Sequence, residues 1–151
     1  MGAGTGLGEC YLTPAVGTGI YSCFPSEGGH VEYAPRNALE SKLWEYLRTK
    51  FPTNHHRISV ERIVSGKGLA NVYEFLAHEF AKSVDPKIHE AFLQAGDEQG
   101  RIVAEHVGKN RLCQQSMDIM MSAYGCHVGS AAITFLPVPT SPVNETLAMS
   151  G

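Results

Sequence analysis

The stretch Gly2-Ala-Gly-Thr-Gly-Leu-Gly-Glu-Cys-Tyr-Leu-Thr13 decides how the chain begins to fold. Its second half, residues 7–13, favours a β-strand, and residues 19–24 favour another. The connection Pro14-Ala-Val-Gly-Thr-Gly19 is long for a hairpin loop, but it keeps the two strands neighbours in sequence. We therefore expect an N-terminal antiparallel β-hairpin.

Helical periodicity governs most of the chain after this hairpin. Asn37, with Glu40 three residues later, is typical of a helix start, and the apolar spacing continues to about Lys50. Further helices are expected at about residues 69–82, 86–95 and 97–107, and from residue 112 onward. Gly125 and Gly129 either end that last helix or give it a face for close packing. Residues 57–64 fit a strand or one short helical turn equally well.

Composition and charge restrict the class of protein. The 151 residues are 43% apolar and 18% charged, which indicates one globular domain. A formal net charge of -3 argues against a nucleic-acid or anionic-membrane partner. No apolar run approaches the ~20 residues of a membrane span, and the first eight residues do not resemble a signal peptide. We expect a cytoplasmic protein.

The four cysteines are scattered, with no Cys-x-x-Cys pair. Buried free thiols are the favoured interpretation in a chain of this size. A metal site built from Cys113, Cys126 and His127 is a weaker alternative, since ligands are few and far apart in sequence. His55 and His56 are expected to be solvated in a polar loop.

Three segments carry chemistry, and the first is the glycine-rich opening. A phosphate needs several converging backbone N–H donors, and glycine allows the tight, close backbone that provides them. Thr5 adds a hydroxyl donor. No Gly-Lys-Ser/Thr follows, and no strand precedes, so neither a Walker A nor a dinucleotide motif is present. The same segment could simply be the glycine-rich end of a hairpin.

The other two segments are acidic. Ser26-Glu-Gly-Gly-His30 places a carboxylate and an imidazole around two glycines, which a tight turn could aim at one polyol. Val60-Glu61-Arg62 precedes Ser65-Gly-Lys-Gly68 and a helix, so its carboxylate is well placed to line a cleft. Taken alone, the first of these segments is better explained as a surface turn with a solvated Glu27, and the second is also explained by a surface pair of Glu61 and Arg62.

Taken in this order, the three segments resemble the bacterial-type glucokinases, a family that also occurs in some protists and algae. The resemblance covers residues 2–80 strongly and residues 97–135 more loosely. It implies an α/β fold in which residues 1–151 form one partial domain of the actin-like, ribonuclease H-like sugar kinases, a hairpin followed mainly by helices. It also implies ATP-dependent phosphorylation of glucose at the 6-hydroxyl in glycolysis, with ATP and Mg²⁺ as cofactors. Full-length members of the family can form homodimers.

The resemblance further assigns roles to individual residues. Hydroxyl groups of glucose would contact the side chains of Glu27, His30 and Glu61. Phosphate of ATP would bind at Gly4, Thr5 and Gly6. No metal ligand is assigned in this chain, and Ala3 stands where the family commonly has proline.

The family's catalytic base is an Asp in an Asn-Asp pair that precedes the glycine loop, and this chain contains no such pair. We therefore expect a partial chain that lacks the catalytic half and has little activity alone. Residues 137–151 lose the resemblance and are expected to be a disordered tail. The alternative functions are an inactive sugar- or nucleotide-binding fragment and an interaction module.

Overall fold

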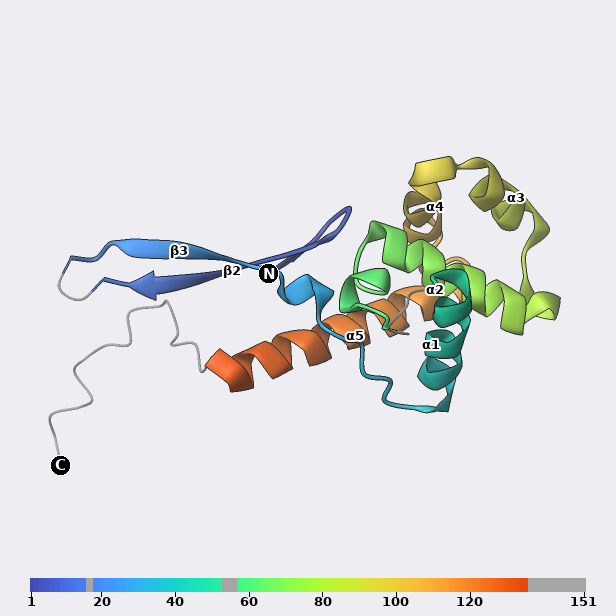
Figure 1. Ribbon diagram of the computed structural model, residues 1–151. Coiled ribbons are helices and arrows are strands. Elements are labelled where there is room, and N and C mark those ends of the chain that lie inside the picture. Colours follow the sequence, from blue (N-terminus) through green and yellow to red (C-terminus); the bar gives the residue numbers. More distant parts are fainter. Residues whose placement is uncertain (16–17, 53–56, 136–151) are drawn as a thin grey trace, which may run out of the picture.

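The computed structural model describes residues 1–15, 18–52 and 57–135 and consists of a helical body with a β-arm projecting from it (Figure 1). The order of elements, a hairpin first and mainly helices afterwards, agrees with the prediction. The expected tail at 137–151 and the histidine pair at 55–56 fall outside the described residues. Among the residues described, no helix combines the length and apolar character that crossing a membrane requires.

The arm is an antiparallel sheet of β1 (Gly2–Ala3), β2 (Leu7–Pro14) and β3 (Tyr21–Ser26), in that order. The predicted hairpin is confirmed, with a register that runs from Glu9 opposite Ser26 to Pro14 opposite Tyr21. Strand β3 begins two residues later than expected because Gly19 has a φ of 67° and belongs to the turn.

Within the described residues, five α-helices form the body: α1 (Ala38–Lys50), α2 (Gly66–Glu79), α3 (Pro86–Gln94), α4 (Gln99–Glu105) and α5 (Arg111–Phe135). Asn37 caps α1 by accepting a hydrogen bond from the Glu40 N–H, as predicted. Ser65 caps α2 in the same way through Gly68, so α2 starts three residues earlier than its apolar pattern suggested.

The part of the chain that the structure describes also contains four short 3₁₀ turns: η1 (Gly28–His30), η2 (Val60–Arg62), η3 (Ala81–Ser83) and η4 (Gly96–Glu98). The ambiguous segment 57–64 contains η2, preceded by a single β-bridge between Ser59 and Glu32. It is therefore one helical turn rather than a strand, although the Ser59 side chain does not cap it.

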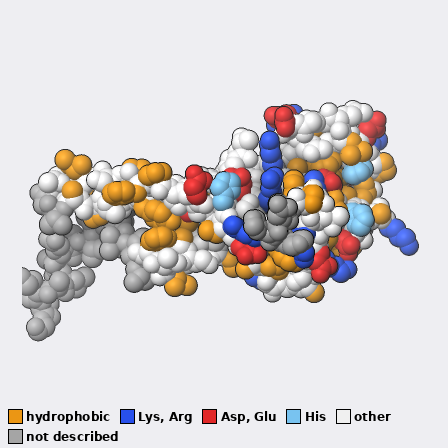
Figure 2. Space-filling model, viewed as in Figure 1, with side chains coloured by type: hydrophobic (Ala, Val, Ile, Leu, Met, Phe, Trp, Pro, Cys, Tyr) orange, Lys and Arg blue, Asp and Glu red, His pale blue; other side chains and the backbone are white. Residues whose placement is uncertain are grey.

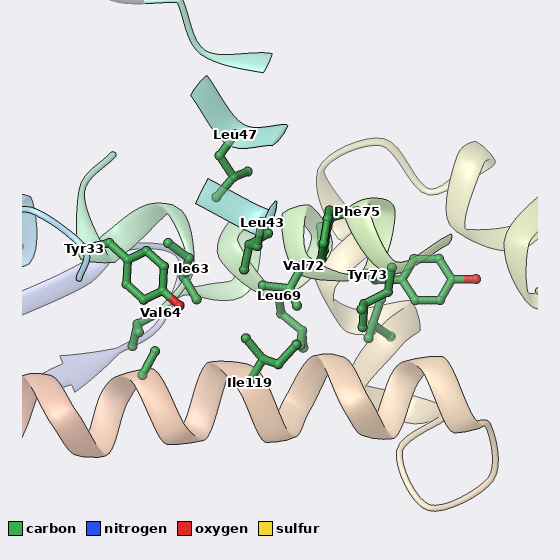
Figure 3. Close-up of a cluster of buried hydrophobic side chains, with 14 of the residues drawn as sticks. Tyr33, Leu43, Leu47, Ile63, Val64, Leu69, Val72, Tyr73, Phe75 and Ile119 are labelled. Carbon is green, nitrogen blue, oxygen red and sulfur yellow. The ribbon is translucent and has the colours of Figure 1, made fainter. Parts of the chain in front are cut away.

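The hydrophobic core surrounds α2, which packs against α1, α4 and α5. Figure 3 shows Ile119 of α5 pointing toward Leu69 and Val72 of α2. The rings of Tyr73 and Phe92 pack within this core in a tilted arrangement, with 4.7 Å between their centroids. The core fixes α2, whose N-terminal end faces the glycine-rich segment.

Two sequence expectations are wrong. Cys113 is buried, but Cys10, Cys23 and Cys126 are exposed, because the arm and the outer face of α5 pack against little. Gly125 lies inside α5 without ending it, and a Cβ atom there would meet nothing within 4 Å; the same holds for Gly129. These glycines therefore do not provide a close-packed helix face.

Candidate functional site

The three segments singled out in the sequence meet at Leu7, the first residue of β2. The Leu7 N–H donates to Glu61 Oε2 at 2.8 Å. At the carbonyl group of the same residue, a Cβ at Gly29 would lie only 2.2 Å from the Leu7 oxygen. The glycine-rich segment, the Glu-Gly-Gly-His turn and the Glu61 turn thus share one backbone junction.

The two glycines of the Glu-Gly-Gly-His turn serve packing rather than an unusual turn angle. Neither residue has a positive φ. A Cβ at Gly28 would lie 1.8 Å from Glu9 Oε2, and that carboxylate is only 2% exposed. A larger residue at Gly29 would press on the β2 backbone at Leu7, whereas one at Gly28 would displace the Glu9 side chain.

The buried Glu9 carboxylate has an imidazole partner on α5. His127, 9% exposed in its side chain, hydrogen-bonds through Nε2 to Glu9 Oε1. This contact ties the arm to the C-terminal half of α5, with η1 packed beside it. Sequence reasoning missed the pair, since its members are 118 positions apart and His127 was considered only as a metal ligand beside Cys126.

Glu27 and His30 form the polar surface of the same turn. His30 Nε2 lies 3.5 Å from Glu27 Oε2, and the two side chains are 60% and 91% exposed. The His30 carbonyl oxygen accepts a hydrogen bond from Arg57 Nη2 at 2.9 Å, and Val60 N–H donates to the Val31 carbonyl oxygen. The turn that carries Glu27 and His30 therefore lies against the turn that carries Glu61.

Glu61 itself points toward the glycine-rich segment. Its Oε2 atom would be 2.7 Å from a Cβ at Gly6, besides accepting from Leu7. The carboxylate therefore orients the start of β2. The structure brings the segments of Glu27, His30 and Glu61 together, with the first two facing solvent and Glu61 turned toward Gly6.

The glycine-rich bend and the N-terminus of α2 form a second polar feature. Gly66 N–H, in the first turn of α2, donates to the Gly4 carbonyl oxygen at 2.7 Å. An open pocket of about 360 Å³ lies there, lined by Gly4, Thr5, Gly66, Lys67, Asp97, Glu98, Gly100 and Arg101. A Cβ at Gly4 would meet no protein atom within 4 Å, so the bend is open to a ligand.

Charges of both signs border this pocket. Lys67 lies 3.8 Å from Asp97, and Arg101 lies 3.0 Å from Glu98. The positive end of α2 adds a preference for an anion. No group of three or more metal-ligating side chains occurs among the described residues, and Cys113, Cys126 and His127 do not form one.

Comparison with known proteins gives a consistent match. A family model described as glucokinase matches residues 1–139. A glucokinase from Synechocystis is 39% identical over 148 residues, which are 91% of this chain and 41% of that protein. A glucokinase from Zymomonas mobilis is 34% identical over 137 residues, 88% of this chain and 36% of that protein.

Solved structures agree with the sequence comparisons. The crystal structure of glucokinase from Balamuthia mandrillaris in complex with glucose has a TM-score of 0.68 at 25% identity, covering 89% of this chain and 36% of that one. Glucokinase from an Antarctic psychrotroph has a TM-score of 0.64 at 24% identity, covering 88% and 37%. The chain spans about two fifths of the length of the curated relatives it matches.

Proposed function

Since the chain belongs to the glucokinase family, we propose that it forms the glucose-recognition part and one phosphate-binding part of an ATP-dependent glucose 6-phosphotransferase. The junction at Leu7 is the observation that supports this most, because it joins the three segments that the proposal needs. The solved relative with glucose bound supports the substrate class.

Glu27, His30 and Glu61 are the proposed glucose contacts. Ionised carboxylates accept hydrogen bonds from sugar hydroxyls, and an imidazole donates or accepts according to its tautomer. The exposed Glu27 and His30 side chains, 3.5 Å apart, can address neighbouring hydroxyls of one ring. One carboxylate oxygen of Glu61, Oε2, accepts the hydrogen bond from the Leu7 N–H. The other oxygen, Oε1, can accept a hydrogen bond from a sugar hydroxyl.

Gly4, Thr5 and Gly6 are the proposed phosphate contacts. The bend sits at the N-terminus of α2, where partial positive charge favours a phosphate. Lys67 and Arg101 line the same pocket and can add charge-assisted hydrogen bonds. Mg²⁺ would arrive with the nucleotide, because the described residues offer no group of three ligands to hold it.

The reaction would be an in-line transfer of the γ-phosphoryl group to the 6-oxygen of glucose. The residues proposed here bind and orient the hydroxyls and hold one phosphate, which accounts for positioning rather than proton removal. The 151 residues contain no Asn-Asp pair to supply the general base. Absence of a general base alone typically costs ~10²–10⁴ in rate.

We expect the 151-residue chain to bind glucose weakly, with a Kd in the millimolar range, on the order of −4 kcal/mol. Two-dimensional amide NMR with D-glucose should shift the Leu7, Gly28 and Gly29 signals, and Glu27→Ala should remove these shifts. Glu61→Gln keeps an oxygen for the Leu7 N–H but removes the charge, and should weaken binding severalfold.

Two controls sharpen this titration. L-Glucose has the same groups with opposite handedness and should not shift these signals. Glu90→Ala should leave the shifts caused by D-glucose unchanged. Glu90 is exposed on α3, away from the site. Equal shifts with both sugars, or undiminished shifts in Glu27→Ala, would contradict the proposal.

The 151-residue chain should also have little kinase activity alone, because it contains no Asn-Asp pair to supply the general base. An assay with ATP and glucose that shows turnover at the rate of an intact kinase would contradict this prediction.

A second candidate function, an interaction module, is favoured by the apolar arm. Leu12, Tyr21 and Phe24 are 58%, 52% and 51% exposed, and Figure 2 shows hydrophobic side chains along the arm. Light scattering under reducing conditions should then show association that grows with concentration. The double change Leu12→Ser and Phe24→Ser should abolish it, whereas Leu93→Ser, at a 63% exposed position on α3, should not. A monomer at every concentration rejects this candidate.

A further inference from the structure

Two exposed cysteines share one face of the arm. Cys10 of β2 stands opposite Pro25, and Cys23 of β3 stands opposite Leu12. Residues directly opposite one another, and residues two apart on a strand, point to the same side of a sheet. Cys10 and Cys23 are therefore diagonal neighbours on one face of the hairpin.

Proline fixes the local geometry of this diagonal. Pro25 has no N–H, so its pairing with Cys10 is of the type without reciprocal hydrogen bonds, in which the side chains come closest. Diagonal Cα atoms lie about 7–8 Å apart in an average sheet, just beyond the usual disulfide limit of about 6.8 Å. Two-stranded ribbons twist more than broad sheets, which shortens one of the two diagonals.

The Cys10 thiol lies close enough to affect the pKa of the Cys23 thiol. A hydrogen bond with the Cys10 thiol is the largest cause that raises the pKa of the Cys23 thiol, ahead of desolvation and of repulsion between the two groups. This influence agrees with the strand register, which makes Cys10 and Cys23 diagonal neighbours on one exposed face. The arm carries little packing that would resist a small closing movement, since most of its residues are exposed.

We propose that Cys10 and Cys23 form a dithiol modification site, which oxidants of the peroxide class convert reversibly into an intramolecular disulfide. Both thiols are open to a small oxidant. The other two cysteines are placed differently: Cys113 is buried in the core, and Cys126 on α5 lies beside the Arg36 guanidinium. Neither faces the arm's dithiol.

The chemistry balances with hydrogen peroxide as the oxidant. One thiolate attacks a peroxide oxygen, the O–O bond breaks, and a sulfenic acid and water result once the hydroxide is protonated. The second thiol then attacks the sulfenic sulfur, an S–S bond forms, and a second water leaves. In total, two thiols and one H₂O₂ give one disulfide and two waters, and two electrons pass from sulfur to oxygen.

The disulfide would join β2 to β3 across the turn and so restrain the arm. Separation of the strands must precede exchange of their ladder amides, so a covalent link should slow that exchange. We expect at least a tenfold slowing at Tyr11 and Phe24, which stand opposite each other between the two cysteines in the register. Amides of α2 should exchange at the same rate in both forms.

The experiment treats the full chain with hydrogen peroxide, blocks remaining thiols with N-ethylmaleimide and digests it with chymotrypsin, without reduction. Chymotrypsin cuts after Tyr11 and Tyr21 and so separates the two cysteines, whereas no Lys or Arg precedes Arg36 for trypsin. We expect a monomer lighter by two hydrogens before blocking, and a linked peptide pair holding Cys10 and Cys23. Dithiothreitol should restore the original mass.

Single serine variants identify the partners. Cys126→Ser, which removes the other exposed thiol, should leave the linked pair unchanged, and Cys10→Ser should abolish it. Both substituted positions are exposed, so these variants should fold. Alkylated Cys10 and Cys23 after peroxide treatment would overturn the proposal, as would a main product linked through Cys126 or between two chains.

Discussion

Replacing Gly29 by alanine should destabilise the folded chain by about 3 kcal/mol, at the upper end of typical overpacking costs. The new methyl group would lie 2.2 Å from the Leu7 carbonyl oxygen and 3.1 Å from the Leu7 Cβ. The Leu7 peptide has little freedom to move, because its N–H is bonded to Glu61. Either the turn or the start of β2 must shift, so glucose binding should fall together with stability.

Gly125→Ala is the matched control for this change. Gly125 lies inside α5, and an added Cβ would meet nothing within 4 Å. Alanine in an exposed helix interior should stabilise by ~0.5–1 kcal/mol. Urea unfolding followed by far-ultraviolet circular dichroism measures both variants. Similar urea midpoints for Gly29→Ala and the unmodified chain would contradict this prediction, because they would show that the backbone at Leu7 accommodates the added methyl group at little cost in stability.

Local signals in the sequence predicted most of the helices and the hairpin. Two helix starts were predictable because a capping motif needs only residues close in sequence. They are marked by Asn37 with Glu40 and by Asp85 with Pro86. The observed starts of α2 and β3 differ from the predicted ones by two or three residues. The N-cap Ser65 sets the start of α2, and the turn residue Gly19 sets the start of β3. Such details depend on single backbone angles rather than on apolar periodicity.

The contacts that assemble the candidate site were not predictable in the same way. The sequence identified the segments of Glu27, His30 and Glu61, but nothing local shows that Glu61 bonds to Leu7. The tight contact at position 28 comes from Glu9, which is remote in sequence and pairs with His127, more remote still. Such constraints exist only after the chain has folded.

Exposure of the cysteines was mispredicted for a related reason. Cysteine is often buried, but this preference holds for residues that reach a core. Cys10 and Cys23 lie on strands that extend away from the helical body (Figure 1), so the apolar alternation of those strands has no core to face. Only the strand register, absent from the sequence, reveals that they are neighbours.

A buried charged cluster holds the segment after η1 against the body. Glu40 of α1, 3% exposed, accepts hydrogen bonds from the Tyr33 hydroxyl at 2.6 Å and from the Arg36 guanidinium at 2.8 and 3.0 Å. Arg36 also donates to the Ser122 carbonyl oxygen of α5 at 2.7 Å. One carboxylate thus connects the chain leaving η1, the start of α1 and the middle of α5.

Glu40→Gln should cost about 3 kcal/mol at pH 7, because it breaks a buried ion pair by removing one partner. The amide keeps the shape but loses the charge, and its NH₂ group faces donors from Arg36 and Asn37. Glu45→Gln, an exposed change on the same helix, should stay within about 0.5 kcal/mol of the unmodified chain. Equal losses in the two variants would contradict the role of the cluster.

The pH dependence separates charge from shape at Glu40. Burial, the largest single influence, acts to raise the pKa of Glu40, but hydrogen bonds from Arg36 and Tyr33 outweigh it, and the pKa is lowered from 4.5. A carboxyl with a lower pKa when folded stabilises fully above its unfolded pKa of about 4.3, and this contribution disappears as the pH falls through the folded pKa. The stability gap between the unmodified chain and Glu40→Gln should therefore be widest near neutral pH and narrow at progressively lower acidic pH. Urea unfolding at a series of pH values measures it, and a gap that stays constant down to pH values where carboxyl groups are protonated would mean that shape alone is responsible.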